Sequence, residues 1–66
     1  MERHVTAARS VYVATRRAVA EAKNDGLTPE GLCQQFGVPY LPGGGWIFAS
    51  AQVAGVIAAD RAKVAE

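Results

Sequence analysis

The 66-residue sequence predicts a small, mainly α protein with a small β-hairpin, folded as a single domain. Three observations support this prediction. Apolar residues recur at helical spacing over residues 3–24, a strong helix start occurs at residues 28–30, and a Pro-Gly-Gly-Gly segment separates two short runs of strand-forming residues within 40–48. The expected order is long helix, short helix, hairpin and C-terminal helix.

A long helix is expected over about residues 3–24, because apolar residues follow one another at alternating steps of three and four. They share one face, formed by Val5, Ala8, Tyr12, Thr15, Val19 and Ala22. Gly26 suits the left-handed conformation that ends many helices. The same spacing is typical of a coiled-coil seam, so two copies could pair as a homodimer through Val5, Tyr12 and Val19. The alternative is that this face covers the rest of the same chain.

A second, short helix is expected over about residues 29–36. Thr28 is a good N-cap, Pro29 suits the first helical position, and Glu30 favours the positive end of the helix dipole. Gly37 is placed to end the helix.

The segment after this helix predicts a hairpin over about residues 40–48. Pro39 and Pro42 disfavour helix, and strand formers at 40–41 and 46–48 flank the glycine-rich turn. A last helix is then expected over about residues 51–64, with Ser50 as its N-cap and with residues 60–63 fraying.

Charge is distributed unevenly along the chain. Residues 1–23 carry five Lys and Arg against two Glu, a net charge of +3, whereas residues 24–66 carry two against four acidic residues, a net charge of −2. An anionic partner should therefore prefer the first helix. Arg9, Arg16 and Arg17 lie opposite its apolar face and are the candidate contacts to the phosphate backbone of duplex DNA. The alternative is an ordinary solvated helix face.

Two stretches resemble the small winged-helix domains of excisionase and MerR-like proteins. Residues 27–30 (Leu-Thr-Pro-Glu) and 36–39 (Phe-Gly-Val-Pro) resemble the start of those domains, and residues 44–48 (Gly-Gly-Trp-Ile-Phe) resemble their wing. The resemblance spans about residues 27–58. In that family a basic recognition helix lies between these stretches, but here only residues 39–43 fill the interval, so that helix is missing.

The resemblance implies a truncated winged-helix protein, a small DNA-associated regulator of the kind that a phage or mobile element encodes. Tyr40, Leu41 and Trp46 would then contact DNA from a wing-like hairpin. For Trp46, the alternative is a core anchor.

A protein–protein interaction module with no nucleic-acid role is the second hypothesis. It would bind a second copy of the chain, or a host or cognate protein, through Tyr12, Val19, Tyr40, Leu41 and Trp46.

Nothing in the sequence favours an enzyme, a metal site or a cofactor. Cys33 and His4 fit packed or frayed positions better than a nucleophile and its base. A strand is expected after the three consecutive glycines, rather than the helix N-terminus and the Lys or Ser/Thr at fixed offset that phosphate loops use. No apolar run is long enough to span a membrane, the N-terminus lacks a signal-peptide core, and the single cysteine fits a reducing compartment, so a cytoplasmic location is expected.

Overall fold

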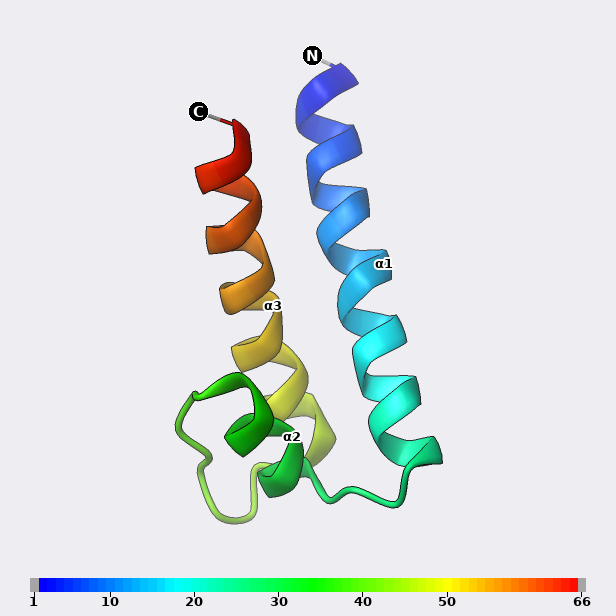
Figure 1. Cartoon of the computed structure of the whole chain (residues 1–66), viewed down its shortest axis with the longest axis vertical. Helices are drawn as coiled ribbons and strands as arrows, with labels where there is room; N and C mark the ends of the chain where they lie inside the picture. Colours follow the sequence, from blue (N-terminus) through cyan, green and yellow to red (C-terminus); the bar gives the residue numbers. More distant parts are fainter. Residues whose placement is uncertain (1, 66) are drawn as a thin grey trace.

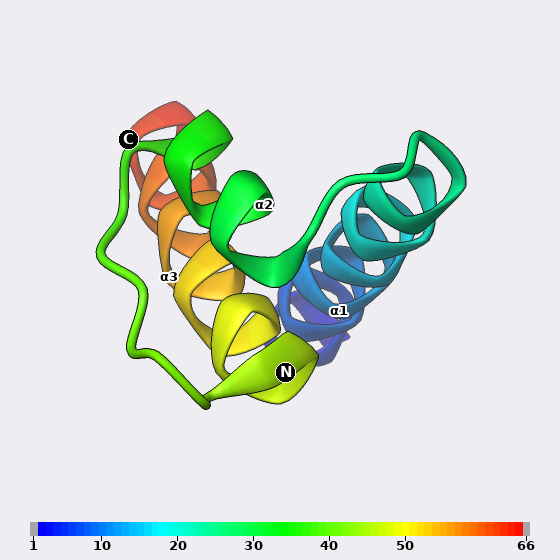
Figure 2. The same ribbon diagram turned by 90° about the horizontal axis from the view of Figure 1, so that it is seen from below.

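The computed structural model describes the backbone of residues 2–65 and the side chains of residues 9–63. It contains three helices, α1 (Glu2–Asn24), α2 (Pro29–Phe36) and α3 (Gly45–Ala65). The long helices α1 and α3 run antiparallel, so that the start of α1 and the end of α3 lie at one end of the molecule, and α2 lies at the other (Figure 1). Seen from below, α3 lies against both α1 and α2 (Figure 2).

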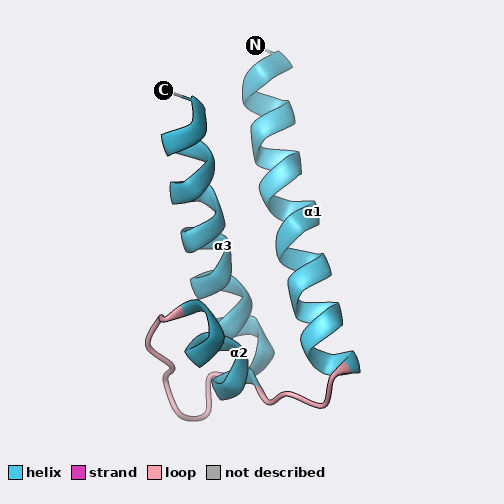
Figure 3. Ribbon diagram, in the orientation of Figure 1, coloured by secondary structure: helices cyan, strands magenta, loops and turns pink. Residues whose placement is uncertain are grey.

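The predicted hairpin is wrong, because the described residues contain helices and loops but no strand (Figure 3). A tight turn replaces it, in which the Gly44 amide donates a hydrogen bond to the Leu41 carbonyl at 2.8 Å. Pro42 and Gly43 occupy the centre of this turn, and Gly43 has a φ of 87°. Pro followed by a glycine of positive φ is the pattern of a type II turn. The turn leads into a helix instead of a second strand.

The first turn of α3 contains the aromatic residues that were expected to form a strand. No Ser, Thr, Asp or Asn caps it. Instead the Gly45 amide donates to the Tyr40 hydroxyl at 3.2 Å, and the Tyr40 ring meets the Phe48 ring edge-on at a centroid distance of 6.1 Å. Tyr40 therefore supplies the acceptor that a helix N-terminus needs. Packing of Trp46 and Phe48 outweighs their modest preference for strands, and α3 begins at Gly45 rather than near residue 51.

The short helix α2 has a cap at each end. The Thr28 hydroxyl accepts a hydrogen bond from the Gly31 amide at 3.0 Å. At the other end Gly37 has a φ of 69°, and the Val38 amide donates to the Cys33 carbonyl at 3.0 Å, which is the Schellman arrangement. These caps hold α2 as two turns, and the helix buries its own Leu32 and Cys33 in the core.

The core lies at the end of the molecule that α2 covers. All three helices contribute to it, through the buried residues Ala22, Leu32, Cys33, Ala49 and Val53. Thr15 is also buried, and its hydroxyl donates to the Val11 carbonyl of its own helix at 2.7 Å. Beyond this region α1 and α3 continue side by side towards the chain ends without a third helix over them (Figure 1). The candidate site lies along this two-helix part.

Candidate functional site

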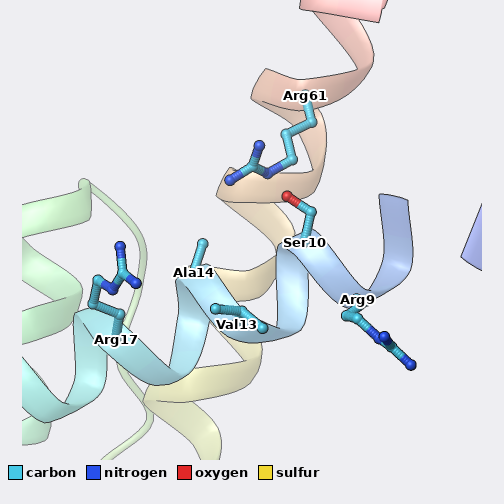
Figure 4. A pocket seen from close by; sticks show the side chains of 6 residues that line it. All are labelled: Arg9, Ser10, Val13, Ala14, Arg17 and Arg61. Atoms are coloured by element: carbon cyan, nitrogen blue, oxygen red, sulfur yellow. The ribbon is translucent and has the colours of Figure 1, made fainter. Parts of the chain in front are cut away.

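A shallow hollow of about 390 Å³ lies between α1 and α3 and is open to solvent. Its lining residues are Arg9, Ser10, Val13, Ala14 and Arg17 of α1 and Arg61 of α3 (Figure 4). Helical spacing explains the α1 set, because residues three and four apart share a face. The antiparallel return of α3 then brings Arg61 beside the first half of α1. We call this site the arginine hollow.

The arginine hollow combines a small apolar surface with a charged rim. Val13 is exposed and Ala14 half-buried, and Ser10 contributes a hydroxyl. In Figure 4, Arg17 and Arg61 extend on the side of α1 that carries Ser10 and Ala14, whereas Arg9 points the other way. Arg17 and Arg61 are therefore the pair placed to act on one ligand.

The lining carries three positive charges and no carboxylate. A guanidinium group carries a positive charge and offers several N–H donors in a fixed plane. The side chains of Arg9, Arg17 and Arg61 are all exposed. The hollow therefore offers guanidinium donors at the surface, where an oxyanion can reach them.

The structure brings together two of the three arginines that the charge pattern singled out. Arg9 and Arg17 line the arginine hollow, but Arg16 does not. The Arg16 guanidinium instead donates to the Tyr12 hydroxyl at 2.9 Å and lies 5.6 Å from the centre of the same ring. The arginine that sequence reasoning missed is Arg61, which was placed in a fraying tail. Only the pairing of α1 with α3 reveals its position.

The residues expected on a wing-like hairpin, 40–48, instead form a turn and the start of α3. Tyr40 is half-buried and caps α3, and Trp46 is half-buried against the core with the Lys23 amino group 5.3 Å from the centre of its indole ring. Leu41 alone is largely exposed, at 58%. For Trp46 the structure thus shows a packing role within the chain.

The expected dimer face of α1 is divided between the surface and the interior. Val19 packs on this chain's own core, whereas Tyr12 is exposed beside Arg16. Val5 lies outside the residues whose side chains are described. Part of this face of α1 therefore packs against the core of its own chain.

The outer side of α3 carries a second exposed surface. Its residues are Ile47, Ala51, Gly55 and Ala58, spaced four, four and three apart and all exposed. Ile47 is 87% exposed, and a Cβ added to Gly55 would meet no atom within 4 Å. We call this the outer face of α3; it carries no charge.

Other chemistry finds little support within the described part of the chain. Cys33 is fully buried in the core, and no group of three or more His, Cys, Asp or Glu side chains is placed to hold a metal ion there. The side chain of His4 lies outside the described residues. None of the described helices pairs the length of a membrane span with sufficient apolar character.

Comparison of the chain with family models, with curated proteins and with solved structures found no match. The resemblance to excisionase and MerR-like domains therefore stays a hypothesis, and the wing that supported part of it is absent. The arginine hollow, rather than a relative, is the basis for assigning a function.

Proposed function

We propose that this protein is a small, non-enzymatic DNA-associated protein that binds the phosphate backbone of a duplex through the arginine hollow. One observation carries the proposal: arginines from two helices surround a single hollow whose lining contains no carboxylate. The planar guanidinium group matches the geometry of phosphate oxygens, and charge-assisted hydrogen bonds of this kind are the stronger ones in proteins.

Binding of this type contacts the backbone and does not read bases. The segment between α2 and α3 is a loop, so no helix occupies the place where the winged-helix family has its recognition helix. Phosphate contacts position a protein on DNA without carrying sequence information. We therefore expect similar affinity for duplexes of different sequence, with a strong dependence on salt.

The salt dependence has a calculable size. Three phosphate contacts give a slope of about −2.7 in a plot of log affinity against log salt concentration. A fourfold rise in salt then weakens binding by about 40-fold, and by about 12-fold once one contact is lost.

Fluorescence anisotropy of a labelled duplex of arbitrary sequence, titrated at low and at physiological salt, tests this. Arg17→Gln removes one contact and should make the slope shallower by about 0.9. Arg16→Gln is the matched control, because Arg16 directly precedes Arg17 on the same helix but contacts Tyr12 and does not line the hollow. An absence of binding at low salt, or equal effects of the two substitutions, would contradict the proposal.

The outer face of α3 favours a second candidate function, self-association of two copies of the chain. Gly55 sits within a helix, where glycine costs about 0.5–1 kcal/mol relative to alanine, yet no neighbour in its own chain requires a small residue. Close approach of a second helix would use that space. An uncharged face also suits a two-fold axis, because residues near the axis meet their own counterparts and like charges would repel.

Sedimentation equilibrium tests self-association. Ile47→Lys should shift a dimer towards monomer, whereas Gln34→Lys, at an exposed position on α2, should not. A wild-type protein that remains monomeric at the highest soluble concentration would exclude this candidate and leave DNA binding unaffected.

A further inference from the structure

We propose that Arg17 and Arg61 hold one phosphodiester group of a nucleic-acid backbone between them, so that the bound nucleic acid clamps α1 to α3. This inference rests on the proposed function and extends it. It assigns a ligand-binding role to a residue of α3, and it predicts that binding changes the stability of the protein.

The geometry of the arginine hollow supports a two-sided grip. Arg17 belongs to α1 and Arg61 to α3, and both extend on the side that carries Ser10 (Figure 4). A phosphate group in this space would receive guanidinium donors from both helices, and the Ser10 hydroxyl is a further donor at the same place. Because the two helices are far apart in sequence, the ligand would join segments that only tertiary packing otherwise holds together.

The hollow lies away from the core, so a ligand bound there would add contacts between α1 and α3 where packing is limited. The largest fully buried side chains are Leu32, Cys33 and Val53, at the end that α2 covers. The hollow lies in the two-helix part, where its apolar lining is limited to Val13 and Ala14. The guanidinium groups of Arg17 and Arg61, which extend on the same side of α1, also repel one another at low salt. This part of the molecule therefore gains more from a bound anion than the core end does.

The lining points to a nucleic-acid backbone rather than to a bare oxyanion. Val13 and Ala14 present an apolar surface beside the arginines. A phosphodiester carries a sugar on each side, and one sugar can lie on that surface while the phosphate meets the arginines. Inorganic phosphate has the charge but not the apolar part, so the two ligands are distinguishable.

The experiment measures thermal unfolding by circular dichroism at 222 nm and low salt. Wild type, Arg61→Gln, Arg17→Gln and the control Arg16→Gln are each compared alone, with inorganic phosphate and with a short duplex. A ligand that binds only the folded protein raises the midpoint of unfolding. We expect the duplex to raise the wild-type midpoint, and the rise to be largely lost in Arg61→Gln and Arg17→Gln but kept in Arg16→Gln.

The midpoint of unfolding without ligand distinguishes a binding role of Arg61 from a purely structural one. If Arg61 merely supported the fold, Arg61→Gln would lower the midpoint without ligand. We expect that midpoint to be unchanged or raised, because the substitution removes a repelling charge. Arg61→Lys keeps the charge but loses the planar donor group, and it should retain only part of the duplex-induced rise.

The failures can be told apart. If Arg61→Gln keeps the full rise while Arg17→Gln loses it, the clamp is overturned and backbone binding by α1 stands. If the wild type neither shifts nor binds the duplex by anisotropy, the clamp and the proposed function are both overturned. If inorganic phosphate alone reproduces the full rise at equal occupancy, the assignment to a nucleic-acid backbone is overturned.

Discussion

Gly44→Ala is expected to destabilise the protein strongly, although it adds a single methyl group. A Cβ at this position would lie 2.6 Å from the Phe48 Cβ, 2.9 Å from the Phe48 Cγ and 3.0 Å from the Leu41 carbonyl oxygen. Rotation of the Phe48 side chain cannot relieve the closest of these contacts, because a Cβ moves only with its backbone. The φ of Gly44 is not in the left-handed region, so the obstacle is space rather than backbone conformation.

The size of the effect follows from the contacts that must give way. Overpacking of this kind costs about 1–3 kcal/mol, and weakening the hydrogen bond from the Gly44 amide to Leu41 adds about 0.5–1.5 kcal/mol. The sum, about 1.5–4.5 kcal/mol, is a large share of the roughly 3–10 kcal/mol expected for the unfolding of 66 residues. At about 4–8 °C per kcal/mol, the midpoint of thermal unfolding should fall by about 6 °C or more.

Gly55→Ala is the matched control, because it makes the same chemical change at a glycine with open space around it. It should stabilise the protein by about 0.5–1 kcal/mol through helix propensity. Urea unfolding followed by circular dichroism measures both variants, at a concentration where the protein is monomeric. A Gly44→Ala protein within about 0.5 kcal/mol of wild type, the range of ordinary surface changes, would refute the close packing of Gly44 on the first turn of α3.

Three further predictions test the caps and the core. Tyr40→Phe keeps the ring contact with Phe48 but removes the acceptor of the Gly45 amide, so the free energy of unfolding in urea should fall by about 1 kcal/mol; no change would show that the hydroxyl caps nothing. Thr28→Ala removes the acceptor of the Gly31 amide and should cost about 1 kcal/mol in the same assay, whereas Thr28→Ser should restore most of it. Cys33 is fully buried, so its thiol should react with a disulfide reagent only as fast as the protein opens, and a rate equal to that of the unfolded chain would place it at the surface.

The parts of the fold that sequence reasoning could reach are those set by local chemistry. The capped helix α2 depends on Thr28, Pro29 and Gly37, whose preferences act within a few residues of chain. The first helix likewise follows from a repeating apolar face. Neither inference needs knowledge of what the segment packs against.

The hairpin prediction was wrong because its evidence was equally compatible with a helix. Pro42 and Gly43 indicate a turn, but a turn does not decide which element follows. The strand preference of residues 46–48 reflects packing on a half-buried surface, and α3 provides such a surface by placing Phe48 against Tyr40. The acceptor for the Gly45 amide comes from a tyrosine five residues earlier, which no standard capping pattern includes.

The arginine hollow shows the corresponding limit for a binding site. The charge pattern groups Arg9, Arg16 and Arg17 because they share one side of a single helix. It contains no sign that the Arg16 guanidinium is bound to the Tyr12 hydroxyl and ring. Nor can it include Arg61, which joins the site only because α3 returns antiparallel to α1. If the three arginines of the hollow act together, replacement of Arg61 should weaken DNA binding as much as replacement of Arg17, although 44 positions separate them in the chain. A protein that used α1 alone would show no such equivalence, so this comparison separates a surface built by the fold from a charged stretch of sequence.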